Sequence, residues 1–330
     1  MGFTDLPPIE KIDAYLDSAF KRARTNARDY TLQESEKSAL ARTRVLALVK
    51  IGTVKDYLSE SFKSIIAKYP NFDNLSEFYT QLLKVSLNYK QLKKSLGSLD
   101  WFIKQLGTLS KKYGRLVRSA TSATEVDKKM AEYYGRASSL LKQIKNELHQ
   151  LHLARQQLRE FPSIKEGLFT VCIAGFPNVG KSTLLAKLTP AKPEINQYAF
   201  TTKKLNMGYV TSQNGTKMQF IDTPGALNRL EKMNDIEKQA FLAMKYVANV
   251  IVYVFDLTGG SYPLADQQKL FKRLKDLDKT LICYLSKTDI LDEETVAAFQ
   301  KSFEKKVIPL TTTREELLSL LAKKQKEFFA

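Results

Sequence analysis

The sequence is poor in the residues that build disulfide frameworks and zinc centres. It contains two cysteines and two histidines among 330 residues. Cys172 and Cys283 each fall within a segment with the pattern of a buried strand, where cysteine behaves as a small apolar residue. His149 and His152 have i, i+3 spacing on a predicted helix, but no second pair of ligand residues accompanies them. We therefore expect neither a disulfide bond nor a cysteine or histidine metal site.

Long hydrophobic runs are absent as well. No apolar segment approaches the roughly 18 residues that a membrane-spanning helix needs. The segment from Met1 to Pro7 lacks the basic and apolar regions of a signal peptide. These absences predict a cytoplasmic protein that does not contact membranes, and we expect a monomer. At 330 residues, with 43% hydrophobic and 26% charged residues, the chain should fold into two globular domains.

Acidic residues are outnumbered, most of all in the first half of the chain. The formal net charge is +17; residues 1–160 hold 28 Lys and Arg against 17 Asp and Glu, which leaves 24 against 18 for residues 161–330. Between residues 84 and 118, basic residues accompany a single acidic residue, Asp100, and four aromatic residues. The basic residues are Lys84, Lys90, Lys93, Lys94, Lys104, Lys111, Lys112, Arg115 and Arg118. The aromatic residues are Tyr89, Trp101, Phe102 and Tyr113.

This basic segment is suited to binding a polyphosphate backbone by counterion release, and exposed aromatic rings could stack on unpaired bases. The alternative is a solvated helical face whose aromatic rings point into the core. Trp101 and Phe102 have an apolar spacing, so we expect both of them in the core.

Residues 9–159 have helical periodicity almost throughout. Apolar residues recur on one face from Ile9 to Ala23. Thr31 and Glu34 have the spacing of a capping box and predict the start of a second helix, which Pro70 stops. The expected helices cover residues 9–23, 31–65, 75–96, 99–119 and 124–158. Short connections between long amphipathic helices predict an antiparallel helical bundle.

Beyond Phe161, Pro162 and Ser163, β-branched segments alternate with helical patterns. The expected strands cover residues 170–174, 204–210, 217–221, 250–255, 281–285 and 306–310. Strands separated by helices predict a mostly parallel sheet with helices on both faces, whose ligands bind at the carboxyl ends of the strands. The chain should therefore combine an α-helical bundle, residues 1–160, with an α/β P-loop domain, residues 161–330.

One segment at a strand end has the pattern of a phosphate-binding loop. It reads Gly175-Phe176-Pro177-Asn178-Val179-Gly180-Lys181-Ser182. Gly175 and Gly180 allow backbone dihedrals that a Cβ forbids, so that N–H groups can surround a phosphate at a helix start. Lys181 would lie over the β- and γ-phosphates, and Ser182 would place its hydroxyl on Mg²⁺. The expected nucleotide-binding residues here are Gly175, Pro177, Asn178, Val179, Gly180, Lys181, Ser182 and Thr183.

Two further segments are expected to complete the magnesium and phosphate site. Asp222 ends a strand, and its carboxylate would hold a water of the Mg²⁺ shell, while Gly225 would offer its N–H to the γ-phosphate. Within residues 198–203 a hydroxyl is suited to complete the Mg²⁺ shell, and we favour Thr202 over Thr201. The expected metal ligands are thus Ser182, Thr202 and Asp222.

The base-reading residues are expected in Ser286-Lys287-Thr288-Asp289, which follows a strand. Guanine presents N1–H and N2–H₂ side by side, and the Asp289 carboxylate can accept both, whereas adenine lacks this donor pair. Lys287 would lie against the base plane. Thr311 and Thr312 are placed to cap guanine O6. The sequence therefore predicts that GTP and GDP bind together with Mg²⁺.

These residues together resemble the nucleolar GTP-binding proteins of the Obg group of GTPases. The shared marks are residues 9–23, Phe161 to Ile164, Pro177-Asn178, residues 198–203 and residues 235–240. The chain looks like the compact archaeal form, without a C-terminal extension. The resemblance implies a GTPase that hydrolyses GTP to GDP and phosphate as a switch in large ribosomal subunit biogenesis. It also implies that the basic bundle binds rRNA, on the large subunit or its precursor.

Three positions qualify what the resemblance implies. Ser286 stands where the base-reading motif usually has Asn. Ala226 stands where Ras-like GTPases have the Gln that orients the attacking water, so we expect slow intrinsic hydrolysis. An Asn at the position of Asn178 helps related GTPases to bind K⁺, so we expect K⁺ to stimulate hydrolysis. The expected catalytic residues are Asn178, Lys181, Thr202 and Gly225. Two alternatives are a guanine-nucleotide switch that does not hydrolyse GTP, and a signalling GTPase with a protein-binding bundle.

Overall fold

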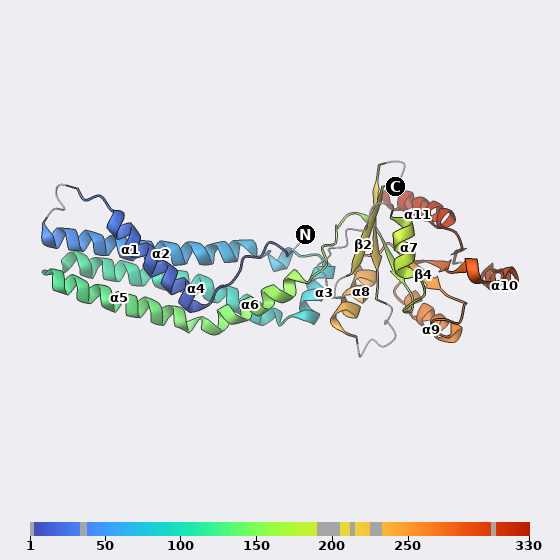
Figure 1. Ribbon diagram of the computed structural model, residues 1–330, viewed down its shortest axis with the longest axis horizontal. Coiled ribbons are helices and arrows are strands. Elements are labelled where there is room, and N and C mark those ends of the chain that lie inside the picture. The colour runs from blue at the N-terminus through green and yellow to red at the C-terminus, as the bar shows by residue number, and fades with distance from the viewer. Residues whose placement is uncertain (1–2, 34–37, 190–204, 212–214, 225–232, 305–307) are drawn as a thin grey trace. The chain divides into compact units, whose positions relative to one another are not determined.

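The computed structural model describes residues 3–33, 38–189, 205–211, 215–224, 233–304 and 308–330. The chain forms two compact units, which Figure 1 shows as a group of long helices and a sheet with helices beside it. The helical unit contains residues 3–74 and 87–159, and the sheet unit contains residues 75–86 and 160–330. The chain therefore enters the sheet unit twice.

The helical unit is built from long amphipathic helices, as predicted. Its helices are α1 (Ile12–Asp29), α2 (Ala39–Lys68), the 3₁₀ turn η2 (Phe72–Asn74), α4 (Tyr89–Ser119), α5 (Ala123–Gln143) and α6 (Lys145–Arg159). In the core, the ring of Phe62 packs edge-on against Tyr15 and Phe102, with ring centroids 5.1 and 5.2 Å apart. The hydroxyl of Tyr133 lies 3.0 Å from that of Ser110, and burial raises the pKa of Tyr133 to about 12.

The boundary between the third and fourth predicted helices is wrong. The sequence predicts a break after residue 96, but α3 (Glu77–Ser86) ends ten residues earlier and α4 runs without interruption through Gly97. The helix start is explained by Asn88, whose side-chain oxygen accepts a hydrogen bond from the N–H of Gln91 at 3.1 Å. The helix boundary is thus set by the cap residue Asn88. The Gly97-Ser98 pair, which stands at the predicted break, does not interrupt the helix.

Two other predicted helices also differ from the observed ones. The second helix begins after Ser38, whose hydroxyl accepts from the N–H of Ala41 at 3.2 Å, and Thr31 lies outside it. The predicted helix over residues 124–158 is divided into α5 and α6 at Ile144.

Of the two adjacent aromatic residues predicted in the core of the bundle, only one lies there. Phe102 is fully buried, whereas Trp101 is 40% exposed on α4. The prediction for Trp101 is wrong because neighbouring residues on a helix point about 100° apart, so both rings cannot enter one buried stripe. Tyr113 is buried as well, and Tyr89 is half-buried.

The sheet unit contains the predicted mostly parallel sheet, with strands in the order β2-β3-β1-β4-β5-β6. The strands are β1 (Phe169–Ala174), β2 (Asn206–Thr211), β3 (Lys217–Asp222), β4 (Val250–Phe255), β5 (Thr280–Leu285) and β6 (Leu310–Thr311). Among the strands that the structure describes, the edge strand β2 alone runs antiparallel to its neighbour. Every residue of β1 and β4 is buried, as expected of central strands covered on both faces.

Helices cover both faces of this sheet, and Figure 1 shows α7 and α11 on one face and α8 on the other. The helices of the unit are α7 (Lys181–Leu188), α8 (Asp235–Tyr246), α9 (Leu264–Lys275), α10 (Glu293–Glu304), α11 (Arg314–Phe329) and α3. α3 packs against α8, and the Tyr79 hydroxyl donates to the carbonyl of Pro162 at 2.9 Å. Among the residues that the structure describes, no helix is both long enough and apolar enough to cross a membrane.

Candidate nucleotide-binding site

The phosphate loop joins the end of β1 to the start of α7. Gly175 has φ +149°, and a Cβ added there would lie 2.8 Å from the backbone oxygen of Val254, so no other residue fits without moving β4. Gly180 has φ +96°, a region that L side chains rarely adopt. Asn178 takes a left-handed conformation with φ +62°, which asparagine tolerates better than most residues. These dihedrals fold the loop tightly before the helix begins.

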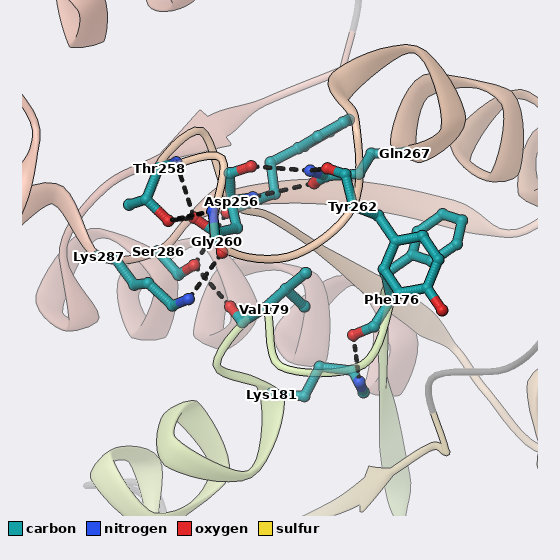
Figure 2. A network of polar contacts seen from close by, with 11 residues as sticks. Phe176, Val179, Lys181, Asp256, Thr258, Gly260, Tyr262, Gln267, Ser286 and Lys287 are labelled. Atoms are coloured by element: carbon teal, nitrogen blue, oxygen red, sulfur yellow. Dashed lines mark hydrogen bonds and ion pairs between the residues drawn. The ribbon is translucent and has the colours of Figure 1, made fainter.

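Lys181 opens α7 and is 7% exposed. Its Nζ donates to the carbonyl oxygen of Phe176, 2.7 Å away (Figure 2). Burial lowers the pKa of Lys181, while the nearby carboxylate of Asp222 acts in the opposite direction. A buried ammonium with one carbonyl partner is poised to accept a better one, such as a phosphate oxygen.

Asp222, at the end of β3, meets the phosphate loop. Its Oδ2 accepts hydrogen bonds from the hydroxyl of Ser182 at 2.6 Å and from the amide of Asn206 at 3.4 Å. Its Oδ1 is buried and has no hydrogen-bond partner among the described residues. Burial raises the pKa of Asp222, against the lowering effects of Ser182 and Lys181. An unpartnered carboxylate oxygen beside a serine hydroxyl fits a hard cation such as Mg²⁺, bound directly or through water.

The raised pKa of Asp222 predicts that Asp222→Asn stabilises the nucleotide-free protein. Above its folded pKa, the wild-type protein must keep a poorly solvated charge, whereas well below pH 4 the carboxyl is protonated in both the folded and the unfolded state. The melting temperature of the variant should therefore exceed that of the wild type at pH 7, and the difference should shrink as the pH falls toward 4.

Thermal melts at the two pH values, with and without GDP and Mg²⁺, measure this effect. The exposed Asp266→Asn, in the same unit, is the matched control and should change little. Adding GDP and Mg²⁺ should raise the melting temperature of the wild type far more than that of Asp222→Asn. A variant less stable than the wild type at pH 7 would show that the carboxylate is structural.

The predicted base-reading segment, residues 286–289, follows β5. The Ser286 hydroxyl lies 2.6 Å from the carbonyl oxygen of Val179 in the phosphate loop and 2.9 Å from that of Phe255. Because one hydroxyl has one proton, it donates to only one of these carbonyls at a time. Ser286 therefore links the base-reading segment to the phosphate loop although it is not Asn. Asp289 is exposed in the short helix η4 (Thr288–Ile290), open to a ligand.

Sequence reasoning missed Asp256, which follows β4 and is 1% exposed. Figure 2 shows the side chains of Lys287 and Thr258 converging on this carboxylate. Its Oδ2 lies 2.7 Å from the Nζ of Lys287, and its Oδ1 accepts from the N–H and the hydroxyl of Thr258 at 2.9 and 2.7 Å. A polar residue at the end of a predicted parallel strand was the signal that could have found it.

Gln267 of α9 fixes the backbone of the same residue. Its side chain accepts from the N–H of Asp256 at 3.0 Å and donates to the Asp256 carbonyl at 2.7 Å. Burial alone would raise the pKa of Asp256, but Lys287 and Thr258 outweigh it and hold that pKa below its usual range. The stability from this ion pair is therefore present above about pH 4 and lost only in stronger acid. Lys287, with φ +56°, is held in place by a preformed anionic partner.

Asp256→Asn should lower the affinity for GDP about tenfold, which corresponds to about 1.4 kcal/mol. The neutral amide no longer pairs with the Lys287 ammonium, so the lysine loses the geometry needed to lie against a base. Titration with a fluorescent GDP derivative measures the loss. In the double variant with Lys287→Met, Asp256→Asn should add nothing further, because its effect passes through Lys287. Additive losses would contradict this role, and Asp266→Asn is again the control.

The aromatic ring of Tyr262 covers the phosphate loop from the segment between β4 and α9. Its centroid lies 4.3 Å from that of the buried Phe176 ring, and Tyr262 itself is 42% exposed (Figure 2). Its backbone carbonyl accepts from Gln267 at 2.7 Å. The loop after β4 therefore contacts the phosphate loop through Tyr262 and, through Asp256, also contacts Lys287.

Of the other predicted site residues, the structure describes Thr311 and Thr312 but not those of the two loops that follow α7 and β3. The Thr311 hydroxyl is buried and donates to the carbonyl of Cys283 at 3.3 Å, and the Thr312 N–H donates to the Glu316 carboxylate at 3.2 Å. Thr201, Thr202, Gly225 and Ala226 lie outside the described residues. Within the described part of the chain, no group of three or more His, Cys, Asp or Glu side chains is placed to hold a metal ion.

Comparison with known proteins identifies relatives of both units. The family described as the NOG1 N-terminal helical domain matches residues 3–165, and the family described as 50S ribosome-binding GTPase matches residues 170–298. An uncharacterised protein of Methanocaldococcus jannaschii is 36% identical over 297 residues, 89% of this chain and 83% of that protein.

Nucleolar GTP-binding protein 1 of Drosophila melanogaster is 33% identical over 280 residues, which cover 82% of this chain but 43% of that protein. The chain spans about half or less of the nucleolar relatives that it matches, from 39% to 50% of their length. A crystal structure titled as a nucleolar GTP-binding protein 1 from Plasmodium falciparum has 24% identity and a TM-score of 0.40. It covers 51% of this chain and 91% of that one.

Proposed function

Because the chain belongs to the NOG1 family of GTP-binding proteins, we propose that it is a GTP-hydrolysing switch in the biogenesis of the large ribosomal subunit. The observation that carries the proposal is the pairing of Ser182 with Asp222 beside an unpartnered carboxylate oxygen. That arrangement suits Mg²⁺ with the phosphates of GTP, and the matching families add the link to the ribosome.

Each side chain of the site has a defined task in this proposal. Lys181 exchanges the Phe176 carbonyl for phosphate oxygens, where it offsets the charge that collects in the transition state. Ser182 and Asp222 would hold Mg²⁺, which would supply positive charge at the same oxygens. Asp289 accepts the two donors of guanine, and Lys287 lies against the base. The methyl group of Ala226 cannot hydrogen-bond the attacking water, so hydrolysis without a partner is slow.

K⁺ is expected to stimulate hydrolysis through Asn178. This side chain is exposed at the turn of the phosphate loop, and its amide oxygen, which has no hydrogen-bond partner among the described residues, could help to bind a monovalent cation. Single-turnover hydrolysis should be about tenfold faster in K⁺ than in Na⁺, the size of a modest electrostatic contribution. Asn178→Ala should remove the difference. Equal rates in the two salts for the wild type would contradict this role.

We propose that the helical unit binds rRNA through α4. Eight of the nine predicted basic residues lie on this helix, while Lys84 lies on α3 in the sheet unit. Lys93 pairs with Asp73 and Lys104 with Asp100, each at 2.6 Å. The remaining six are exposed and form no ion pair with any residue that the structure describes: Lys90, Lys94, Lys111, Lys112, Arg115 and Arg118. Exposed unpaired cations are what counterion release from a phosphate backbone requires.

Cosedimentation with purified large ribosomal subunits tests the proposal. The protein is loaded with GDP or a non-hydrolysable GTP analogue, and binding is measured over a range of salt concentrations. We expect tighter binding with the analogue and a steep loss of binding as salt rises. Binding that is indifferent to the nucleotide, or absent, would contradict the switch.

A pair of charge variants assigns the contact to α4. Lys112→Gln with Arg115→Gln should weaken binding and lower the slope of log affinity against log salt by about 1.5, as expected for two lost phosphate contacts. Lys21→Gln with Arg24→Gln removes the same charge from exposed positions of α1 and should leave the slope nearly unchanged. An equal effect of both pairs would point to net charge rather than to α4.

A further inference from the structure

The exposed indole of Trp101 lies within a row of cations on α4. On an ideal α-helix, Lys90, Lys94, Lys112 and Arg115 fall within about 40° of Trp101. All four are exposed, and none of them has an ion-pair partner in the part of the chain that the structure describes. We call Trp101 and these four residues the Trp101 stripe.

The stripe is free of negative charge. Asp100 lies about 100° around the helix from Trp101, and its carboxylate is neutralised by Lys104 at 2.6 Å. At a rise of about 1.5 Å per residue, the distance from Lys90 to Arg115 is about 37 Å. Two cations lie toward each end, with the indole between them. This spacing suits an extended polyanion that carries flat apolar groups.

The space beside the indole is open. Long side chains on a helix lean toward its N-terminus, so residue 97, four positions before Trp101, would cover the ring if it had a side chain. It is Gly97, and a Cβ built there meets no described heavy atom within 4 Å apart from its chain neighbours and the nearby backbone of its own helix. Glycine weakens the interior of a helix, yet this one lies within a helix of 31 residues. Its absence of a side chain leaves room for a ring to approach the indole.

We propose that Trp101 stacks on an unpaired base of an RNA strand whose phosphates follow the stripe. The inference rests on the proposed RNA binding of α4 and narrows its ligand to RNA with an unstacked base. Bases inside a duplex are already stacked and present only their edges, so the indole cannot lie against their faces. Stacking on an aromatic ring tolerates any base, so the contact selects single-stranded or bulged RNA rather than a sequence.

Trp101 is the only tryptophan of the chain, so its fluorescence reports on this contact directly. The full-length protein is titrated with a single-stranded oligouridine, with a blunt RNA duplex of the same number of phosphates, and with polyglutamate. We expect the single strand to quench the tryptophan emission strongly, and the emission to return as added salt dissociates the complex. The duplex should bind with little quenching, and polyglutamate should not quench.

Three variants separate stacking from charge. Trp101→Ala should weaken binding of the single strand about tenfold, a loss within the range known for one stacked base, and leave binding of the duplex unchanged. Trp101→Phe should retain most of the affinity. Gly97→Leu should weaken binding of the single strand as much as Trp101→Ala does, because the leucine side chain covers the indole. It should not lower the melting temperature, because leucine favours the helix more than glycine does.

The possible failures are distinguishable. If neither RNA binds the wild type at low salt, the proposed RNA binding fails and this inference fails with it. If both RNAs bind the wild type but Trp101→Ala has the same affinity for the single strand as the wild type, only the stacking contact is refuted. Quenching by polyglutamate as strong as that by RNA would overturn the inference in favour of an acidic protein partner.

Discussion

Asp289→Asn should transfer the preference of the protein from guanine to xanthine nucleotides. The exposed Asp289 carboxylate can accept hydrogen bonds from guanine N1–H and N2–H₂. An amide NH₂ in its place would face the N2 donors, but it would donate to the carbonyl oxygen that xanthine carries at that position. Two hydrogen bonds to a charged acceptor are worth about 1.5–3 kcal/mol each. We therefore expect the affinity for GDP to fall at least about 100-fold and the affinity for XDP to rise.

Competition titrations with GDP and XDP measure this transfer. The matched control is Asp292→Asn, three residues further on. The Asp292 carboxylate is exposed and accepts from the N–H and the hydroxyl of Thr295 at 2.6 and 2.8 Å, so it serves the local turn. The control should bind both nucleotides as the wild type does. If Asp289→Asn lost GDP and gained no XDP, with an unchanged melting temperature, Asp289 would not be the base-reading residue.

Lys181→Met should remove hydrolysis without loss of folding stability. The buried ammonium is proposed to contact the phosphates, and its only hydrogen bond among the described residues is to the Phe176 carbonyl. Methionine has similar length and no desolvation cost, so the nucleotide-free variant should melt at the wild-type temperature or above. Losing a preorganised positive charge at the phosphates should slow hydrolysis at least about 100-fold.

Single-turnover hydrolysis and thermal melts of the nucleotide-free protein test the two halves of this prediction. Lys187→Met, at an exposed position of the same helix, is the control for the loss of one charge from α7. Hydrolysis within a few fold of the wild type would show that Lys181 is structural. A large fall in melting temperature would show that its ammonium stabilises the loop, contrary to what its burial implies.

The sequence was most informative where the chemistry of a single residue type is restrictive. Gly175 was predictable because its φ and its 2.8 Å approach to β4 exclude any side chain. Ser182 and Asp222 were predicted to share one magnesium site because ligands bind at the carboxyl ends of such strands, and the structure joins the two side chains at 2.6 Å. Local pattern therefore sufficed to bring Ser182 and Asp222 together, while their binding of phosphate and Mg²⁺ stays a prediction.

The features that the sequence could not predict depend on contacts between residues that are far apart in the sequence. Asp256 acquires its role only from contact with Lys287, which is 31 residues away, and with Gln267. No local signal showed that α4 would run unbroken through Gly97, because the cap at Asn88 competes with a more obvious glycine and serine pair. Trp101 was assigned to the core for the same reason, since apolar spacing does not show which of two adjacent aromatic residues turns inward.

The membership of α3 in the sheet unit has a consequence for the order of events during synthesis. α3 buries Phe78, Tyr79, Leu82 and Leu83, and it packs against α8, which begins about 150 residues later. At the usual elongation rate of about 5–20 residues per second, α3 is synthesised about 8–30 s before its partner. During that interval its apolar face is exposed on the nascent chain, while the helical unit on both sides of it is being completed. The sheet unit therefore cannot fold from residues 160–330 alone, because α3, which is synthesised before residues 87–159 of the helical unit, must also pack against it.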